Sequence, residues 1–148
     1  MTPEEILRLF NESELFKNLG FSITELNENS LILEISDDNP CHRGGFGSLE
    51  GTGINGAVIS AAMESAIGIC GFSAFGGQPS GVIELSVKML RVIRKKPCRV
   101  EAVIDRKNNN LAFVSATLNS ASGGICAKAT GIVAYVGKSK NVENGSDI

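Results

Sequence analysis

One carboxylate stands alone in a long apolar segment of this chain. Between Thr52 and Ile83 the only charged side chain is that of Glu64, which lies in the run INGAVISAAMESAIGICGFSAF (54–75). An ionised carboxylate is costly in apolar surroundings, and burial raises the pKa of such a group toward values that suit acid–base chemistry. Glu64 is therefore the first candidate for a general base or a nucleophile.

Glu64 also has a purely structural interpretation. A glutamate at the edge of a helix can pair with a lysine or arginine, or face solvent, without taking part in any reaction. The residue itself does not decide between the two interpretations. Only the apolar sequence on both sides of Glu64 favours the catalytic one.

Asn55 and Gly56 stand at the predicted start of a helix over 54–71. The first N–H groups of a helix have no partner within it and lie at the positive end of its dipole, so they can hold a carbonyl oxygen as it becomes an oxyanion. Gly56 would let a ligand approach the backbone closely. The structural alternative is an N-cap asparagine and a glycine that permits tight helix–strand packing.

The spacing of these residues bears on how they could act together. Nine residues separate Asn55 from Glu64, which is two and a half turns at about 3.6 residues per turn. The two side chains then face opposite sides of one helix. In a dimer with two antiparallel helices, the N-terminus of each helix could lie beside the Glu64 carboxylate of the other. The spacing therefore predicts two equivalent sites at a two-fold interface.

A basic cluster follows one predicted strand. Arg91, Arg94 and Lys95, with Lys96 beside them, could attract the phosphates of a ligand such as coenzyme A. An ordinary solvated turn is the simpler interpretation of the same residues.

The cysteines and the single histidine indicate no metal site. None of the four cysteines forms a CxxC pair, and a structural zinc site usually needs close ligand pairs. Cys41 stands beside His42, but sequence neighbours rarely reach the geometry of a nucleophile and its base. We expect His42 to line a loop over the site or to be exposed, and Cys70 to be a small core residue. The N-terminus resembles a capped amphipathic helix and no leader, so we expect a cytoplasmic protein with reduced cysteines.

The elements that position these residues follow from periodicity. We expect an N-terminal helix within 1–18, strands over 20–26 and 30–36, a glycine-rich loop over 37–53, and the central helix over 54–71. Four more strands are predicted over 82–92, 98–105, 110–118 and 125–136. In the first of them the apolar residues Ile83, Leu85, Val87 and Met89 alternate with polar ones. The tail over 138–148 is polar and is expected to be disordered.

Composition places limits on the class of protein. A chain of 148 residues suits one domain, here 1–137, and a net charge of −2 gives no reason to expect nucleic acid as a partner. A membrane-spanning helix needs about 20 apolar residues, and the polar residues of 54–75 interrupt such a run. A helix that is apolar all round must be enclosed. We therefore predict an α+β fold in which an antiparallel sheet curls around the helix or a second subunit covers it.

The phrase GTGINGAVISAAMESAIG, together with the strands that follow it, resembles the hotdog-fold thioesterases of the phenylacetate-degradation type. That family typically reads G-x-x-H-G-G, with a carboxylate nine residues after the histidine. Asn55, Gly56 and Ala57 stand at the His-Gly-Gly positions, and Glu64 stands at the carboxylate position. ELSVKMLRV (84–92) and NNNLAFVSATL (108–118) are similar to two of the family's strands.

The resemblance implies a long helix wrapped by a curved sheet of five to six strands, in homodimers that often pair into homotetramers. It implies acyl-CoA at the dimer interface, a backbone N–H near the helix start that polarises the thioester carbonyl, and a carboxylate from the partner subunit. No cofactor is expected beyond the coenzyme A of the substrate. The Glu64-Ser65 pair is similar to the branch that acts on aromatic acyl-CoA.

This chain departs from the family pattern at four positions, one of which is Leu49, where an asparagine is usual. Asn55 replaces the histidine, Ala57 replaces the second glycine, and Val82 stands where a serine or threonine is often seen. Because asparagine cannot carry a proton as histidine can, two hypotheses stay open: a thioester hydrolase that depends on Glu64, and a non-catalytic acyl-CoA or fatty-acyl binder. A hotdog dehydratase would need a catalytic histidine, and the only one here lies outside the helix.

Overall fold

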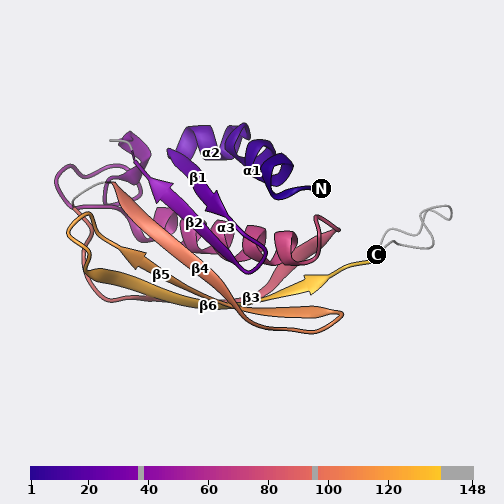
Figure 1. Ribbon diagram of the computed structural model, residues 1–148. Helices are drawn as coiled ribbons and strands as arrows, with labels where there is room; N and C mark the ends of the chain where they lie inside the picture. Colours follow the sequence, from indigo (N-terminus) through magenta and orange to yellow (C-terminus); the bar gives the residue numbers. More distant parts are fainter. Residues whose placement is uncertain (37–38, 95–96, 138–148) are drawn as a thin grey trace, which may run out of the picture.

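A single long helix, α3 (Gly56–Ala74), lies across one face of a six-stranded antiparallel sheet. The computed structural model describes residues 1–36, 39–94 and 97–137, and the tail over 138–148 and the pair Lys95–Lys96 lie outside this description. Figure 1 shows the helix in the hollow of a strongly twisted sheet. The expected α+β architecture is thereby confirmed.

The sheet contains all six predicted strands in the order β1-β2-β4-β5-β6-β3. Their bounds are β1 (Phe21–Leu26), β2 (Ser30–Ile35), β3 (Ser80–Met89), β4 (Cys98–Lys107), β5 (Leu111–Asn119) and β6 (Ile125–Tyr135). Because β3 pairs only with β6, it forms one edge of the sheet, and β1 forms the other.

Small side chains in the middle of the sheet allow α3 to approach it closely. Strands β5 and β6 present four buried alanines to the helix, namely Ala112, Ala116, Ala127 and Ala129. The helix is equally close at Gly71, where an added Cβ would lie 2.6 Å from Val133. Aliphatic residues of α3 such as Met63 and Ile67 fill the remaining space and are fully buried.

The N-terminal segment forms two helices where one was predicted. Helix α1 (Pro3–Asn11) ends at Glu12, and α2 (Glu14–Leu19) begins after Ser13. The hydroxyl of Ser13 accepts from Phe16 N at 3.3 Å and donates to Phe10 O at 2.7 Å, so it caps the second helix and redirects the chain. The break lets aromatic side chains from both helices reach the body of the domain.

A bulge changes the phase of β3. The pairing of β3 with β6 shifts between Val82 and Glu84, and Ile83 is left 64% exposed. The alternation seen in the sequence therefore does not put Ile83 on the face of Leu85 and Val87, because the extra residue of a bulge moves the preceding side chains to the opposite face. Val82 packs against the core in its place, together with Leu85 and Val87.

Helix α3 begins at Gly56, with Asn55 as its N-cap, and ends three residues later than predicted. Its length and its mean hydropathy of 1.5 would allow it to cross a membrane. However, many of its side chains between Val58 and Gly71 are buried in the core of the domain. The same apolar composition is what a central core helix requires.

Candidate active site

The start of α3 is held by the side chain of Asn55. Its Oδ1 accepts from Val58 N at 3.0 Å, and its Nδ2 donates to Cys41 O at 2.7 Å and to Arg43 O at 2.9 Å. The backbone N–H of Asn55 also donates to His42 O at 2.7 Å. Asn55 is buried and joins the preceding loop to the helix with every polar atom of its amide. It therefore carries the structural role that was one of its two interpretations.

The next two residues of α3 keep their backbone donors available. Within the described chain, neither Gly56 N nor Ala57 N has a hydrogen-bond acceptor. Ala57 is exposed, and Gly56 is half-buried beside Met89, whose Sδ would lie 3.2 Å from a Cβ at Gly56. Two unpaired N–H groups at the positive end of a helix are a suitable arrangement for holding an oxyanion.

Glu64 lies on the side of α3 that the sheet does not cover. Its side chain is exposed in the single chain, so the predicted burial of this carboxylate is not found there. The reason is that one sheet covers only one side of a helix, and a stripe along the opposite side stays more open (Ala57, Ser60, Ala61, Glu64 and Gly68). Glu64 has no hydrogen bond or ion pair with any residue the structure describes.

An apolar hollow opens beside Glu64. It has a volume of about 420 Å³ and lies between α1–α2, α3 and the start of β3. Val82, one of the predicted binding residues, belongs to its wall: an added Cβ on Gly68 would lie 3.2 Å from Val82 Cγ2 and 3.9 Å from Glu64 Oε1. The structure thus brings Glu64 and Val82 together.

Aromatic residues from distant parts of the chain form much of this wall. The ring of Phe10 packs edge-on against Phe72 of α3, with centroids 5.8 Å apart, and contacts Phe16 at 6.3 Å. Nothing in the pattern of the N-terminal segment indicated that Phe10 lies beside Glu64. Only the helix break at Ser13, a serine followed by an acidic residue, could have signalled it.

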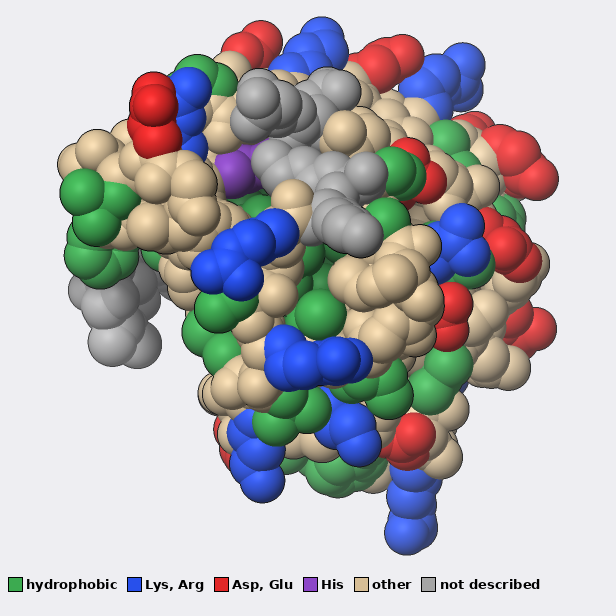
Figure 2. Space-filling view, turned by 90° about the vertical axis from the view of Figure 1, so that its left-hand side faces the viewer, with side chains coloured by type: hydrophobic (Ala, Val, Ile, Leu, Met, Phe, Trp, Pro, Cys, Tyr) green, Lys and Arg blue, Asp and Glu red, His purple; other side chains and the backbone are tan. Residues whose placement is uncertain are grey.

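The basic residues lie at the other end of α3. Arg91 donates from both Nε and Nη2 to Ile125 O at 3.2 Å, and with Arg94, Ser120 and Ser122 it lines a hollow of about 190 Å³. Figure 2 shows lysine and arginine side chains spread over this end of the molecule. Lys95, the third predicted member of the cluster, lies outside the described residues.

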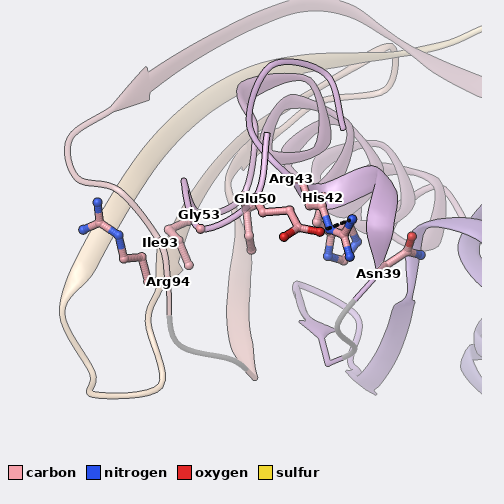
Figure 3. Close-up of a pocket in the computed structure, with 9 residues that line it drawn as sticks. Asn39, His42, Arg43, Glu50, Gly53, Ile93 and Arg94 are labelled. Atoms are coloured by element: carbon pink, nitrogen blue, oxygen red, sulfur yellow. Dashed lines mark ion pairs between the residues drawn. The ribbon is translucent and has the colours of Figure 1, made fainter. Parts of the chain in front are cut away.

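A second hollow, of about 410 Å³, adjoins Arg94 (Figure 3). Arg43 pairs with Glu50 at 3.2 Å there, and the Arg94 guanidinium points away from this pair. His42 also lines this hollow, but it is only 2% exposed, and its Nε2 lies 2.5 Å from Leu19 O. His42 is therefore a buried residue of the loop, and the expectation of an exposed His42 is wrong.

The thiols add no nucleophile to either end of the helix. Burial, with a smaller contribution from Asp105, raises the pKa of the Cys70 thiol to about 12, so this core residue stays protonated and unreactive. Cys41 is exposed, and its thiol lies 3.8 Å from Asn18 O. No group of three or more metal-ligating side chains occurs among the residues described.

Residues 52–127, just over half of the chain, match the family described as the thioesterase superfamily. The chain belongs to the thioesterase superfamily. The matched segment contains α3 with Asn55, Gly56 and Glu64, and β3 with Val82. A comparison with curated proteins finds no match.

Solved structures of this superfamily share the hotdog fold of the chain. A thioesterase family protein from Silicibacter pomeroyi superposes with a TM-score of 0.77 at 18% identity, covering 90% of this chain and 97% of that one. A protein from Shewanella oneidensis related to the thioesterase superfamily gives 0.79 at 16% identity, covering 89% and 94%. A thioesterase from Haemophilus influenzae gives 0.74 at 15% identity, covering 90% of each chain.

The geometry at Asn55 predicts that its main contribution is to stability. Asn55→Ala removes an N-cap and two donors to buried carbonyl groups, so we expect the free energy of unfolding to fall by about 2 kcal/mol or more. Asn55→Asp keeps the cap acceptor but loses both donors, and should lie between Asn55→Ala and the wild type. Urea unfolding followed by circular dichroism measures both changes. An Asn55→Ala protein of wild-type stability would contradict the structural role.

Proposed function

We propose that this chain is an acyl-CoA thioesterase that works as a dimer. Glu64 of one chain acts on a thioester whose carbonyl oxygen is held at the start of α3 of the other. The observation that carries the proposal is the unpaired carboxylate of Glu64 beside an apolar hollow in a member of the thioesterase superfamily. No cofactor is required, and a cytoplasmic location fits a substrate of this class.

The reaction needs only water and the groups already described. Glu64 takes a proton from a water molecule as its oxygen attacks the thioester carbonyl, or attacks that carbonyl directly before water releases the acid. The N–H groups of Gly56 and Ala57 stabilise the oxyanion that forms. The C–S bond then breaks, the thiolate of coenzyme A takes a proton, and a carboxylic acid remains.

Distance supports a site shared by two chains. Gly56 and Glu64 are eight positions apart, a rise of about 12 Å along the helix, so the Glu64 carboxylate and the N–H of Gly56 in one chain cannot contact the same carbonyl. Helix α3 has its open stripe on the side that a second chain would cover, and such a chain would bury Glu64. This cover would supply the apolar surroundings that the single chain lacks.

The two edges of the sheet differ in a way that supports pairing through β3. At the β1 edge, the amide of Asn11 accepts from Ile23 N at 2.7 Å and donates to Ile23 O at 3.0 Å, which occupies backbone groups that a further strand would need. Strand β3 has exposed Ile83 and Met89 and no such cover in the described structure. An uncovered edge strand is a ready template for a second copy.

The lining of the hollow supports an apolar acyl group. Phe10, Phe16 and Phe72 surround the space next to Glu64, and aromatic walls suit aromatic or other bulky apolar acyl groups. This agrees with the phenylacetate-degradation type, which we propose as the subtype. The alternative function is an acyl-CoA binder without turnover, which is favoured by one observation: the amide of Asn55 has no polar atom left for a substrate.

We predict that hydrolysis depends on Glu64. Glu64→Gln removes the base but keeps the shape of the side chain, so we expect kcat to fall by about 10²-fold or more. The purified protein is incubated with short, long and aromatic acyl-CoA thioesters, and released coenzyme A is quantified by chromatography.

Glu28→Gln is the matched control, because Glu28 is an exposed glutamate between β1 and β2 that lies neither on the proposed dimer edge nor in the hollow. It should keep wild-type activity. Undiminished turnover by Glu64→Gln would contradict the role of Glu64. Saturable binding by the wild type without any release would instead establish the acyl-CoA binder.

A site shared between chains predicts complementation. Glu64→Gln lacks the base, and Ala57→Trp blocks the helix start from an exposed position, so each dimer alone should be inactive. Refolding the two variants together creates mixed dimers with one intact site, and activity should recover to about a quarter of wild type when chains pair at random. Gel filtration confirms that each variant forms dimers. No recovery from a well-formed mixture would contradict the shared site.

The basic end of the molecule predicts a phosphate-specific effect. Arg94→Ala should raise KM about 3- to 10-fold for acyl-CoA and leave kcat unchanged, because a lost charge–phosphate contact weakens binding of the nucleotide portion only. The same acyl group on pantetheine, which has no phosphate, should show no change in KM. Arg106→Ala, an exposed arginine on β4 outside these hollows, serves as the control. Equal effects on both substrates would contradict phosphate binding.

A further inference from the structure

One buried polar atom in the described structure has no hydrogen-bond partner, and it is Ser80 Oγ. Ser80 is the first residue of β3. Nearly all buried polar groups in folded proteins are paired, so an exception calls for a specific explanation. Its position is informative, because Ser80 belongs to the wall of the hollow that contains Glu64.

Ser80 lies one side-chain position beyond Val82 along this wall. Val82 lies over Gly68 close to Glu64 Oε1, and Ser80 comes two residues before Val82 on the same strand face. Side chains two apart on a strand face are separated by roughly 7 Å. A ligand whose thioester reaches Glu64 would therefore bring a more distant part of its acyl group to Ser80.

The residues around Ser80 that the structure describes provide no hydrogen-bond partner for its hydroxyl. The nearby walls are mainly apolar, with Phe10, Phe16, Ile69 and Phe72. Two other serines line the hollow: Ser65, a buried residue of α3, and Ser13, whose hydroxyl is engaged with Phe10 O and Phe16 N. No hydrogen bond in the described structure restrains the Ser80 side chain, so it can change between staggered rotamers and turn its oxygen toward the hollow.

We propose that Ser80 hydrogen-bonds a hydroxyl or keto oxygen on the acyl group, remote from the thioester. This rests on the proposed function, and it narrows the substrate class to bulky apolar acyl groups that carry one such oxygen. A plain hydrocarbon of equal size leaves the hydroxyl unpaired inside an apolar wall, which makes it the poorer ligand. Ser80 is therefore a specificity-determining residue, and it takes no part in bond breaking.

Coenzyme A thioethers test this without hydrolysis. Eight-carbon S-alkyl chains are compared with analogues that carry a hydroxyl or keto oxygen at successive carbons of the far half, alongside phenylethyl and hydroxyphenylethyl thioethers. Isothermal calorimetry on the wild-type protein should show one oxygenated ligand binding about 5- to 10-fold more tightly than its plain counterpart. Ser80→Ala should abolish this preference while binding the plain thioethers as well as before.

Ser86→Ala is the control, because Ser86 is an exposed serine of β3 that is absent from this hollow. It should retain the full preference. Binding of all thioethers without preference, or a preference that survives Ser80→Ala, would overturn the role of Ser80 and leave the thioesterase proposal standing. Failure of every thioether to bind would overturn both. Loss of turnover alone would not affect the comparison, since the thioethers report binding.

Discussion

The structure depends on how one apolar helix is buried. Helix α3 carries a single charged residue, and one six-stranded sheet can cover only one of its sides. The buried alanines of β5 and β6 and the contact of Gly71 with Val133 bring that side to close packing. The opposite side keeps an open stripe with Glu64 in its middle. The aromatic residues of α1 and α2 cover part of this stripe, and the space they leave is the hollow proposed for the acyl group.

The helix and all six strands could be predicted because each follows a strong local period. Residues 54–75 are more apolar than an exposed helix allows, and β2 places Leu31, Leu33 and Ile35 at alternate, buried positions. The failures lie where one residue changes the geometry. Ser13 ends one helix and caps the next, and the extra residue Ile83 reverses the faces of β3 at a bulge. The bulge depends on pairing with the distant strand β6, so the local pattern of β3 carries no trace of it. The cap at Ser13 rests on two local bonds, to Phe10 O and Phe16 N, which do not alter the apolar periodicity of the segment.

A residue of the candidate site could be predicted from the sequence only when its type differs clearly from the types around it. Glu64 is isolated in charge, and the sequence alone identifies it. Phe10 and Phe16 look like any amphipathic stripe, and their place beside Glu64 follows only from the path of the chain after Ser13. Ser80 looks like a turn residue in GGQPSG, and its interest arises from an unpaired oxygen that only three-dimensional packing shows. Asn55 was expected at the start of a helix, but the sequence did not predict that its side chain forms three hydrogen bonds there.

The role of Asn55 constrains any mechanism for this chain. Its Oδ1 is committed to Val58 N and both bonds of its Nδ2 are committed to the loop, so it can supply neither a proton nor a hydrogen bond to a substrate without loosening the helix start. What remains at that end is the backbone, in the N–H groups of Gly56 and Ala57. Proton transfer in the proposed reaction must then fall to Glu64. Because Glu64 is some two and a half turns away along the same helix, the two functions can meet only across a pair of chains.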